Sequence, residues 1–312
     1  MRVAVTGGAG YIGSLLVKNL LDGGHEVSSI DNLSIGDYRY VRGLSQKGLR
    51  VLEGDIRDGE AMDDALTGVD TVAHLAALPG LVLCEEKPEE AISTNVFGTH
   101  QVLEAAKRNG ISRVVFCSSA SVYGVPQAMP VTEEHCLRPL NLYGVTKLAG
   151  EKLMETYHDN HSLETVSLRF GNIYGVGLYT RWVTVIPKFV RLGLLGKPLT
   201  VYGDGTSSRD FVHVEDITQA LTLAMTAKGI RGEVYNVGSE PTTIGRIAEM
   251  VSDEVERTMG RRPKTTNLPP RPGETKEFSY DLSKIENSLG FTPRWTLKRG
   301  IRQLVDYAMK NP

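Results

Sequence analysis

The sequence has few cysteines, no excess of one charge and no long apolar run. Its three cysteines, Cys84, Cys117 and Cys136, lack the spacing of a metal or redox motif, so we expect reduced thiols and no bound metal. Lys and Arg total 35 against 37 Asp and Glu, which predicts no basic surface for nucleic acid or an anionic membrane. No apolar run approaches the roughly 20 residues of a membrane span, and Met1 lies too close to the first strand for a signal peptide. A cytoplasmic protein is therefore expected.

Glycine is well represented, and its most informative use is near the start of the chain. A short apolar strand, residues 3–6, leads into a turn before an amphipathic helix begins at Ser14. The cofactor-binding candidates in this turn are Gly7, Gly10, Tyr11, Ile12 and Gly13. Gly7 allows the bend out of the strand, Gly10 lets the backbone approach a pyrophosphate, and Gly13 lets the helix pack close to the strand. The turn therefore predicts a dinucleotide site.

Asp31 ends the second predicted strand, residues 25–30, eighteen positions beyond Gly13. A carboxylate at this place suits the two hydroxyls of an adenine ribose and repels a 2′-phosphate. The sequence therefore favours NAD over NADP. The polar stretch from Asn32 to Gln46 is expected to wrap around the adenosine.

The third predicted strand, residues 49–53, ends beside two more cofactor candidates. Asp55 can accept a hydrogen bond from the adenine amino group while Ile56 packs on the ring. The alternative is purely structural, with Asp55 forming a turn and Asp58 capping a helix over residues 59–66. Both interpretations of Asp55 stay open at this point.

The fourth predicted strand, residues 71–77, ends in small residues that let a cofactor pass over it, and the candidates there are Leu75, Ala76 and Ala77. His74 is expected to be a hydrogen-bonded core histidine rather than a catalytic one. Asn95 is a further cofactor candidate, in a long helix predicted from Ala91 to Asn109. This helix has apolar residues on more than one face, which suits packing on the sheet and on a partner subunit.

The fifth strand, residues 112–117, runs into a serine-rich segment, where ligands of an open α/β sheet bind. Later, Tyr143 and Lys147 lie four positions apart on a helix predicted over residues 143–160, so their side chains share one face. The lysine, with a positive nicotinamide ring, favours the phenolate form of the tyrosine. Lowering its pKa from about 10 to about 7 needs roughly 4 kcal/mol.

The glycine turn, Asp31, the serine segment, the Tyr143/Lys147 pair and later motifs together resemble the extended short-chain dehydrogenase/reductase family, in particular its nucleotide-sugar 4-epimerases. This resemblance covers essentially the whole chain. We expect an α/β fold: a Rossmann-type doubly wound parallel sheet in an NAD-binding domain over 1–170, and a smaller, interleaved substrate-binding α/β domain over 171–312. Strands near residues 211 and 234 are expected to rejoin the large sheet, so that about 211–238 returns to the first domain. Further helices are expected over 183–193, 215–227 and 243–259.

The resemblance also implies roles for individual residues. Tyr143 would remove the proton from the sugar 4-hydroxyl while hydride leaves C4 for NAD, and hydride would return to the opposite face of the 4-ketose. Ser119 would hydrogen-bond the reacting oxygen, with Lys147 as the third catalytic residue. The substrate-binding candidates are Ser119, Ser121, Tyr143, Asn172, Arg209, Arg271 and Phe278. Arg209 and Arg271 would hold the diphosphate through paired hydrogen bonds.

Three alternatives to an epimerase are open. In the family's 4,6-dehydratases, Asp-Glu follows the active-site hydroxyl, but here Ala120 and Ser121 stand there and cannot exchange a proton. The uronate decarboxylases begin with the same oxidation, and uronate-specific members carry an arginine after the fourth strand, where residues 75–84 hold no charge. A non-catalytic dinucleotide-binding regulator has little need of Ser119, Tyr143 and Lys147 together.

The expected substrate is therefore a neutral nucleotide hexose, UDP-glucose/UDP-galactose. In related epimerases a bulky residue at the position of Phe278 goes with rejection of N-acetylated sugars, although Phe278 is equally well explained as a core residue. A homodimer packing helices 91–109 and 143–160 into a four-helix bundle is the family expectation.

Overall fold

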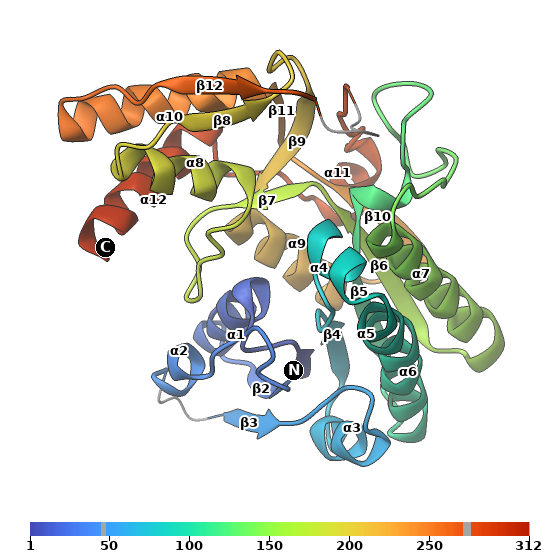
Figure 1. Ribbon diagram of the computed structural model, residues 1–312. Helices are drawn as coiled ribbons and strands as arrows, with labels where there is room; N and C mark the ends of the chain where they lie inside the picture. The colour runs from blue at the N-terminus through green and yellow to red at the C-terminus, as the bar shows by residue number, and fades with distance from the viewer. Residues whose placement is uncertain (45–47, 271–275, 312) are drawn as a thin grey trace.

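The computed structural model describes residues 1–44, 48–270 and 276–311 of the chain. Its largest element is a parallel sheet of seven strands in the order β10-β6-β5-β4-β1-β2-β3 (Figure 1). These strands are β1 (Arg2–Thr6), β2 (Glu26–Asp31), β3 (Leu49–Glu53), β4 (Thr71–His74), β5 (Arg113–Ser119), β6 (Glu164–Phe170) and β10 (Glu233–Val237). The strand order reverses between β1 and β4, which is where such sheets bind ligands. The expected Rossmann-type α/β fold is confirmed.

Helices cover both faces of this sheet (Figure 1). One face carries α3 (Gly59–Leu66), α6 (Gly98–Arg108) and α7 (Leu142–His161), and the other carries α1 (Tyr11–Asp22), α9 (Val214–Thr226) and α11 (Ser283–Leu289). Shorter helices are α2 (Arg39–Arg42), α4 (Leu81–Glu86) and α5 (Pro88–Ile92). The result is three layers with two hydrophobic cores.

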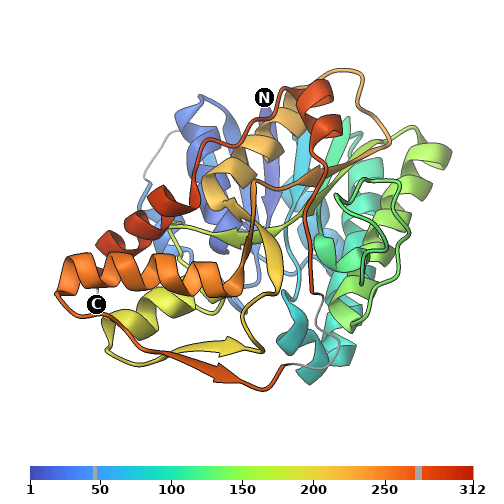
Figure 2. The same ribbon diagram turned by 90° about the horizontal axis from the view of Figure 1, so that it is seen from above.

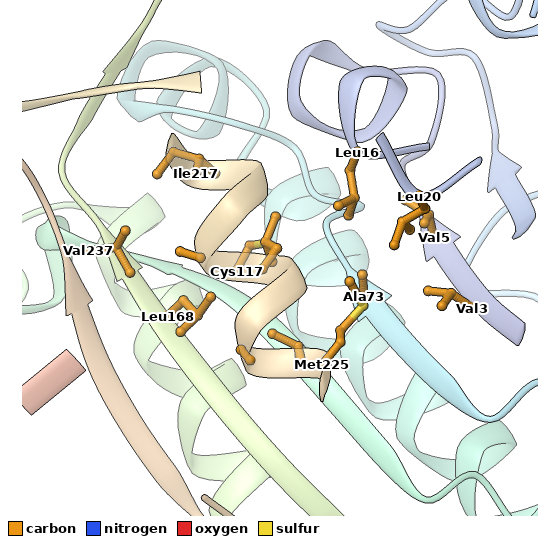
Figure 3. Packing of buried hydrophobic residues seen from close by; sticks show 14 of the residues in the cluster. Val3, Val5, Leu16, Leu20, Ala73, Cys117, Leu168, Ile217, Met225 and Val237 are labelled. Carbon is orange, nitrogen blue, oxygen red and sulfur yellow. The ribbon is translucent and has the colours of Figure 1, made fainter. Parts of the chain in front are cut away.

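The central strands are buried on both faces, which explains their continuous apolar runs. Val3 and Val5 of β1 point to the face of α1 and α9, and Figure 3 shows them beside Leu16 and Leu20. Ala4 between them belongs to the core on the opposite face. Alternation along the strand therefore supplies both cores from a single apolar run.

The smaller part of the molecule has its own core and sheets (Figure 2). Its three-stranded sheet has the order β11-β9-β7, and a second sheet pairs β12 with β8. The strands are β7 (Asn172–Tyr174), β8 (Leu199–Tyr202), β9 (Ser208–His213), β11 (Glu240–Thr243) and β12 (Thr265–Leu268), and the helices are α8 (Val185–Leu194), α10 (Ile244–Met259) and α12 (Leu297–Lys310).

The two parts exchange chain segments, but not all as expected. Strand β10 joins the large sheet beside β6, whereas β9, the strand near residue 211, does not. The expectation for that strand is wrong because β10 already occupies the free edge of β6, and β9 pairs instead with β7 and β11. The division into domains at residue 170 stays a prediction.

The long helix expected over 91–109 is interrupted. Helix α5 passes into a π-helical turn, η1 (Ser93–Phe97), before α6 begins. The helices expected over 59–66, 143–160, 183–193, 215–227 and 243–259 are observed within two residues of those bounds. In the described ranges, the helices are all too short or too polar to cross a membrane.

Two polar side chains begin helices that border the ligand-binding edge. The Asp58 carboxylate accepts a hydrogen bond from the N–H of Glu60, as the capping interpretation predicted for α3. Asn141 accepts from the N–H of Gly144 at 2.8 Å and starts α7. Each side chain satisfies a backbone donor that the helix itself leaves unpaired.

Asp210 of β9 joins the smaller sheet to the segment before α11. Its carboxylate accepts hydrogen bonds from the N–H groups of Ser239 at 2.7 Å and Tyr280 at 3.2 Å. The side chain is buried, and no ion pair to it is formed within the described ranges. Burial raises the pKa of the Asp210 carboxyl to about 6, although the two N–H donors oppose this rise.

We predict that Asp210 makes stability decrease with rising pH. Its pKa is higher in the folded than in the unfolded chain, so its contribution is complete below pH about 4 and is lost as the pH rises through about 6. Relative to Asp210→Asn, the free energy of unfolding of the wild type should fall by roughly 3 kcal/mol from pH about 4 to pH about 7. Denaturant unfolding of both proteins measures this difference, in which other titrating groups cancel. A difference that is constant with pH contradicts the prediction.

Candidate active site

A cavity opens at the carboxyl ends of the large sheet, between that sheet and the smaller part of the molecule. The ends of the strands contribute Gly7 after β1, Asp31 of β2, Leu75 after β4, Ser119 of β5 and Phe170 of β6. The opposite wall comes from the smaller part, and includes Tyr174, Arg181, Ile186 and Phe211. The cavity therefore lies where the strand order reverses, as the fold predicts.

The glycine turn forms one end of the cavity. Gly7 has a φ of +72°, and a Cβ on Gly13 would lie 2.1 Å from the Gly7 carbonyl oxygen. Gly10 precedes the first residue of α1 without a capping side chain, so the N–H groups of that helix end are available. Tyr11 and Ile12 also line the cavity. This combination of close packing and uncapped N–H groups suits a pyrophosphate.

Asp31 lies beside this turn and is held there by two backbone donors. Its carboxylate accepts from the N–H groups of Ala9 at 3.0 Å and Leu33 at 2.8 Å. Burial raises the pKa of Asp31, and these hydrogen bonds oppose the rise. Asp31 and Asn32 both line the cavity, so a carboxylate is presented where a ribose would lie next to a bound pyrophosphate.

The small residues after β4 form the floor of the cavity, and those that line it are Leu75, Ala76 and Ala77. A Cβ on Gly7 would lie 2.8 Å from the Ala76 nitrogen, so the floor packs directly against the glycine turn. Ile56 lines the side of the cavity. The turn, the carboxylate and this apolar floor together fit NAD.

Three side chains meet at the other end of the cavity. Ser119, Tyr143 and Lys147 all line it. The Lys147 ammonium donates to the Cys117 carbonyl oxygen at 2.8 Å and lies 5.8 Å from the centre of the Tyr143 ring. Lys147 is 4 % exposed. The helical spacing predicted from the sequence places the Tyr143 hydroxyl and a buried cation side by side on α7, and the end of β5 adds the Ser119 hydroxyl.

Burial governs the pKa shifts at this end of the cavity. Burial raises the pKa of the Tyr143 hydroxyl to about 12, with Arg181 and a hydrogen bond from Ser119 opposing the rise. Burial also lowers the pKa of Lys147 to about 8. Desolvation of the tyrosine therefore outweighs the charge of Arg181. The predicted phenolate also depends on the positive nicotinamide ring and stays a prediction.

Two of the cofactor candidates lie beside the cavity without lining it. Asp55 forms an ion pair with Arg57 at 2.6 Å, and this guanidinium lowers the pKa of its carboxyl to about 2. The Asn95 amide donates to Thr146 and exchanges hydrogen bonds with the backbone of Leu78. Asp55 and Asn95 therefore support the walls of the site, and direct contact with a cofactor stays a prediction.

Some of the predicted substrate-binding residues line the cavity and others do not. Asn172 lines the cavity, whereas Ser121, Arg209 and Phe278 are not part of its lining. Phe278 is 6 % exposed and packs on Tyr123 and Tyr280, which matches the alternative of a core residue. Arg271 lies outside the described residues.

The loop from β7 to α8 brings in residues that the sequence analysis missed, namely Tyr179, Arg181 and Thr184. The Arg181 guanidinium lies 3.4 Å from the Pro79 carbonyl oxygen, and its charge affects the pKa of Tyr143. The buried Thr184 hydroxyl has no hydrogen-bond partner within the described ranges. No periodic pattern marks this loop, so the only available signal was an arginine between Asn172 and the next helix.

Comparison with known proteins agrees with this geometry. The Thermus thermophilus UDP-glucose 4-epimerase, solved in complex with NAD, is 33% identical, with a TM-score of 0.87 and 98% of each chain covered. The UDP-N-acetylglucosamine 4-epimerase of Methanobrevibacter ruminantium is 31% identical, with a TM-score of 0.91 and 100% of this chain and 99% of that chain covered.

An enzyme that catalyses a different reaction has a similar sequence identity and TM-score. The dTDP-glucose 4,6-dehydratase of Streptomyces venezuelae, solved with NAD, is 31% identical, with a TM-score of 0.92 and coverage of 100% of this chain and 98% of that chain. The family model described as "NAD dependent epimerase/dehydratase family" matches residues 3–238. The chain is therefore an enzyme that uses NAD, and it belongs to the NAD-dependent epimerase/dehydratase family.

Proposed function

We propose that the protein is an NAD-dependent 4-epimerase of a nucleotide sugar, with UDP-glucose and UDP-galactose as its substrate pair. The observation that carries this proposal is the meeting of Ser119, Tyr143 and Lys147 at the opposite end of one cavity from the glycine turn. A sugar bound there lies between these side chains and the cofactor floor. Such an arrangement supports reversible oxidation of one sugar hydroxyl.

Each of the three side chains has a defined task in this reaction. When bound, NAD takes up a hydride from the sugar and returns it, and its positive nicotinamide ring favours the Tyr143 phenolate. Tyr143 accepts the proton of the 4-hydroxyl and later gives it back, while Ser119 donates a hydrogen bond to the same oxygen. Lys147, with a pKa of about 8, keeps most of its positive charge at neutral pH beside the phenolate.

The two residues after Ser119 favour epimerisation over 4,6-dehydration. Elimination of water needs an acid and a base at the sugar, and Ala120 and Ser121 offer neither. The carboxylates among the described lining residues are Asp31 and Glu90. Asp31 lies at the glycine turn and Glu90 lies near Arg57, so neither is placed beside Tyr143.

The diphosphate of the substrate is assigned to the smaller part of the molecule. Asn172 and the unpartnered Thr184 hydroxyl line the cavity there, and Thr184 directly precedes α8. The N–H groups at the start of that helix favour an anion. Arg209 and Arg271 remain proposed diphosphate ligands.

We predict that Ser119→Ala lowers kcat by roughly 100-fold or more, because it removes a hydrogen bond to the reacting oxygen. Tyr143→Phe should abolish turnover because the proton acceptor is lost. NMR of the anomeric protons, with UDP-galactose and no added reductant, measures conversion to UDP-glucose.

Ser112→Ala is the matched control, since Ser112 is an exposed serine just before the same strand, donates to the Asp70 carbonyl oxygen and does not line the cavity. Ser121→Ala is not suitable, because the Ser121 hydroxyl accepts a hydrogen bond from Ser119. Equal activity of Ser119→Ala and Ser112→Ala would contradict the role of Ser119. Formation of a nucleotide-linked 4-keto-6-deoxy sugar would contradict epimerisation itself.

Arg181 favours a second candidate substrate, a nucleotide-linked uronic acid. The neutral hexose was expected because residues 75–84 hold no charge, but the structure places the Arg181 guanidinium against the Pro79 carbonyl in that same wall. Arg181 has no ion-pair partner within the described ranges, and it lies close enough to Tyr143 to affect its pKa. An arginine so placed can pair with a carboxylate at C6 of the sugar.

For this second candidate, the wild type should convert UDP-glucuronic acid into UDP-galacturonic acid in the same NMR assay. Arg181→Gln should lower that activity by roughly 30-fold or more, by removing the partner of a buried carboxylate, and change UDP-galactose turnover far less. Arg191→Gln on α8 is the matched control, because that side chain is exposed and outside the cavity lining. Turnover of UDP-galactose without any turnover of the uronate rejects this candidate, and formation of a UDP-linked pentose with loss of CO2 identifies a decarboxylase.

The homodimer is proposed through the helices expected from the sequence. Ile92 of α5, Phe97 of η1 and Val145 of α7 are exposed apolar side chains on these neighbouring elements. Pairing of this face with a second copy would bury them.

We predict that Phe97→Asp converts a dimer into a monomer, because a charge at the centre of an apolar contact is costly to bury. Light scattering after size-exclusion chromatography measures the mass. Met309→Asp is the matched control, since Met309 has the same exposed fraction, 46%, but lies on α12. If the Phe97→Asp variant is still a dimer, the interface does not involve this face.

A further inference from the structure

A chain of buried hydrogen bonds starts at the glycine turn and passes through His74. Thr6 is the residue before Gly7, and its hydroxyl oxygen accepts the N–H groups of Leu75 and Ala76, each at 3.2 Å. The same hydroxyl lies 2.8 Å from Nδ1 of His74. The cofactor floor is therefore tied to the end of β1 and, through Thr6, to the imidazole ring.

From the other side of the ring, the chain continues to the helix that carries the catalytic residues. Nε2 of His74 lies 3.0 Å from the Thr99 hydroxyl, which donates to the Asn95 carbonyl oxygen at 2.6 Å. The Asn95 amide donates to the Thr146 hydroxyl at 3.0 Å, and Thr146 donates to the Tyr143 carbonyl oxygen at 2.9 Å. The path thus ends on the backbone of Tyr143.

The hydrogen bonds of Thr6 and Thr99 determine which ring nitrogen of His74 carries the proton. The Thr6 hydroxyl accepts the N–H of Ala76 and shares the N–H of Leu75 with its own carbonyl oxygen, which leaves its proton for Nδ1. The Thr99 proton goes to Asn95, so Thr99 accepts from Nε2. His74 is therefore neutral and protonated on Nε2.

Burial leaves the imidazole no alternative partner or charge state. Thr6, His74, Asn95, Thr99 and Thr146 are each 2% exposed or less. Burial, together with the charge of Lys147, lowers the pKa of His74 to about 3. The ring also packs on Phe116, 5.6 Å away between ring centres.

The same path fixes the far end of the cofactor floor. The Asn95 side chain accepts from the N–H of Leu78 at 2.7 Å and donates to its carbonyl oxygen at 3.1 Å. Thr6 holds the near end, at Leu75 and Ala76. Asn95 lies in the π-helical turn η1, a feature that often marks a functional region.

We propose that neutral His74 is a positioning residue, which sets the distance between the cofactor floor and Tyr143 through Thr6, Thr99 and Asn95. This role concerns NAD binding and alignment and is independent of which sugar the enzyme takes. The proposed role accounts both for the buried His74 and for the π-helical turn η1 that interrupts the helix. A displacement of about 1 Å between cofactor and catalytic group can cost roughly 100-fold in rate.

The main test compares Thr99→Val with Thr99→Ser. Valine removes both hydrogen bonds of the hydroxyl at nearly constant volume, whereas serine keeps them. We expect Thr99→Val to weaken NAD binding and to lower kcat, each by roughly tenfold or more, and Thr99→Ser to restore both to within about twofold. NAD affinity is measured by calorimetry on apoprotein, and kcat by the NMR assay.

Thr165→Val controls for the loss of a buried hydroxyl as such. Thr165 is also 2% exposed and donates to the Met154 carbonyl oxygen, but it does not line the cavity or belong to the path. It should lower the thermal midpoint without weakening NAD binding. Equal effects of Thr99→Val and Thr165→Val on NAD affinity would overturn the proposal, even if epimerase activity is absent.

A second measurement tests the tautomer directly and needs no variant. In protein labelled with 15N-histidine, long-range 1H–15N spectra distinguish protonated from unprotonated ring nitrogens. We expect the His74 ring to show protonated Nε2 and unprotonated Nδ1, unchanged from pH about 5 to pH about 9. A proton on Nδ1, or titration of His74 in this range, would contradict the proposed path.

Discussion

The position of one buried ammonium group determines the geometry of the active site. Lys147 donates to the carbonyl oxygen of Cys117, near the end of β5, and so fixes where α7 lies along that strand. Ser119 follows on the strand and Tyr143 precedes by one helical turn, so the three groups meet. Burying a charged group costs free energy, and burial lowers the pKa of Lys147 although the carboxylate of Glu151 opposes this change. Lys147 is buried although this costs free energy, and it lines the cavity beside Tyr143, where the proposed reaction uses a positive charge.

Electrostatics and burial act in opposite directions on Tyr143. The cations Lys147 and Arg181 lie nearby, yet burial dominates and holds the pKa of the hydroxyl at about 12. In the proposed reaction, the positive nicotinamide ring of bound NAD would oppose this effect of burial and favour the phenolate.

The substrate wall is built from distant parts of the chain. Loop residues 175–184 lie between β7 and α8, and Tyr11 of the glycine turn donates to the Gly175 carbonyl oxygen at 2.7 Å. The loop that carries Arg181 is therefore anchored to the cofactor side of the cavity. The proposed choice between a neutral hexose and a uronate therefore concerns a loop that is tied to the glycine turn.

The sequence by itself determined the features that depend on local chemistry. The glycine turn, Asp31, the cap at Asp58 and the Tyr143/Lys147 spacing follow from residues within a few positions of one another, and the parallel sheet follows from alternating apolar strands and helices. These patterns also indicated many of the residues that line the cavity.

Only the tertiary structure decided the rest. The partner of β9, the place of Arg181 against Pro79, and the hydrogen bonds of His74 to Thr6 and Thr99 depend on residues that are far apart in the chain. The raised pKa of Tyr143 depends on how completely the folded protein excludes water. Periodicity and spacing describe neighbours along a chain, and neither contains information on such contacts or on desolvation.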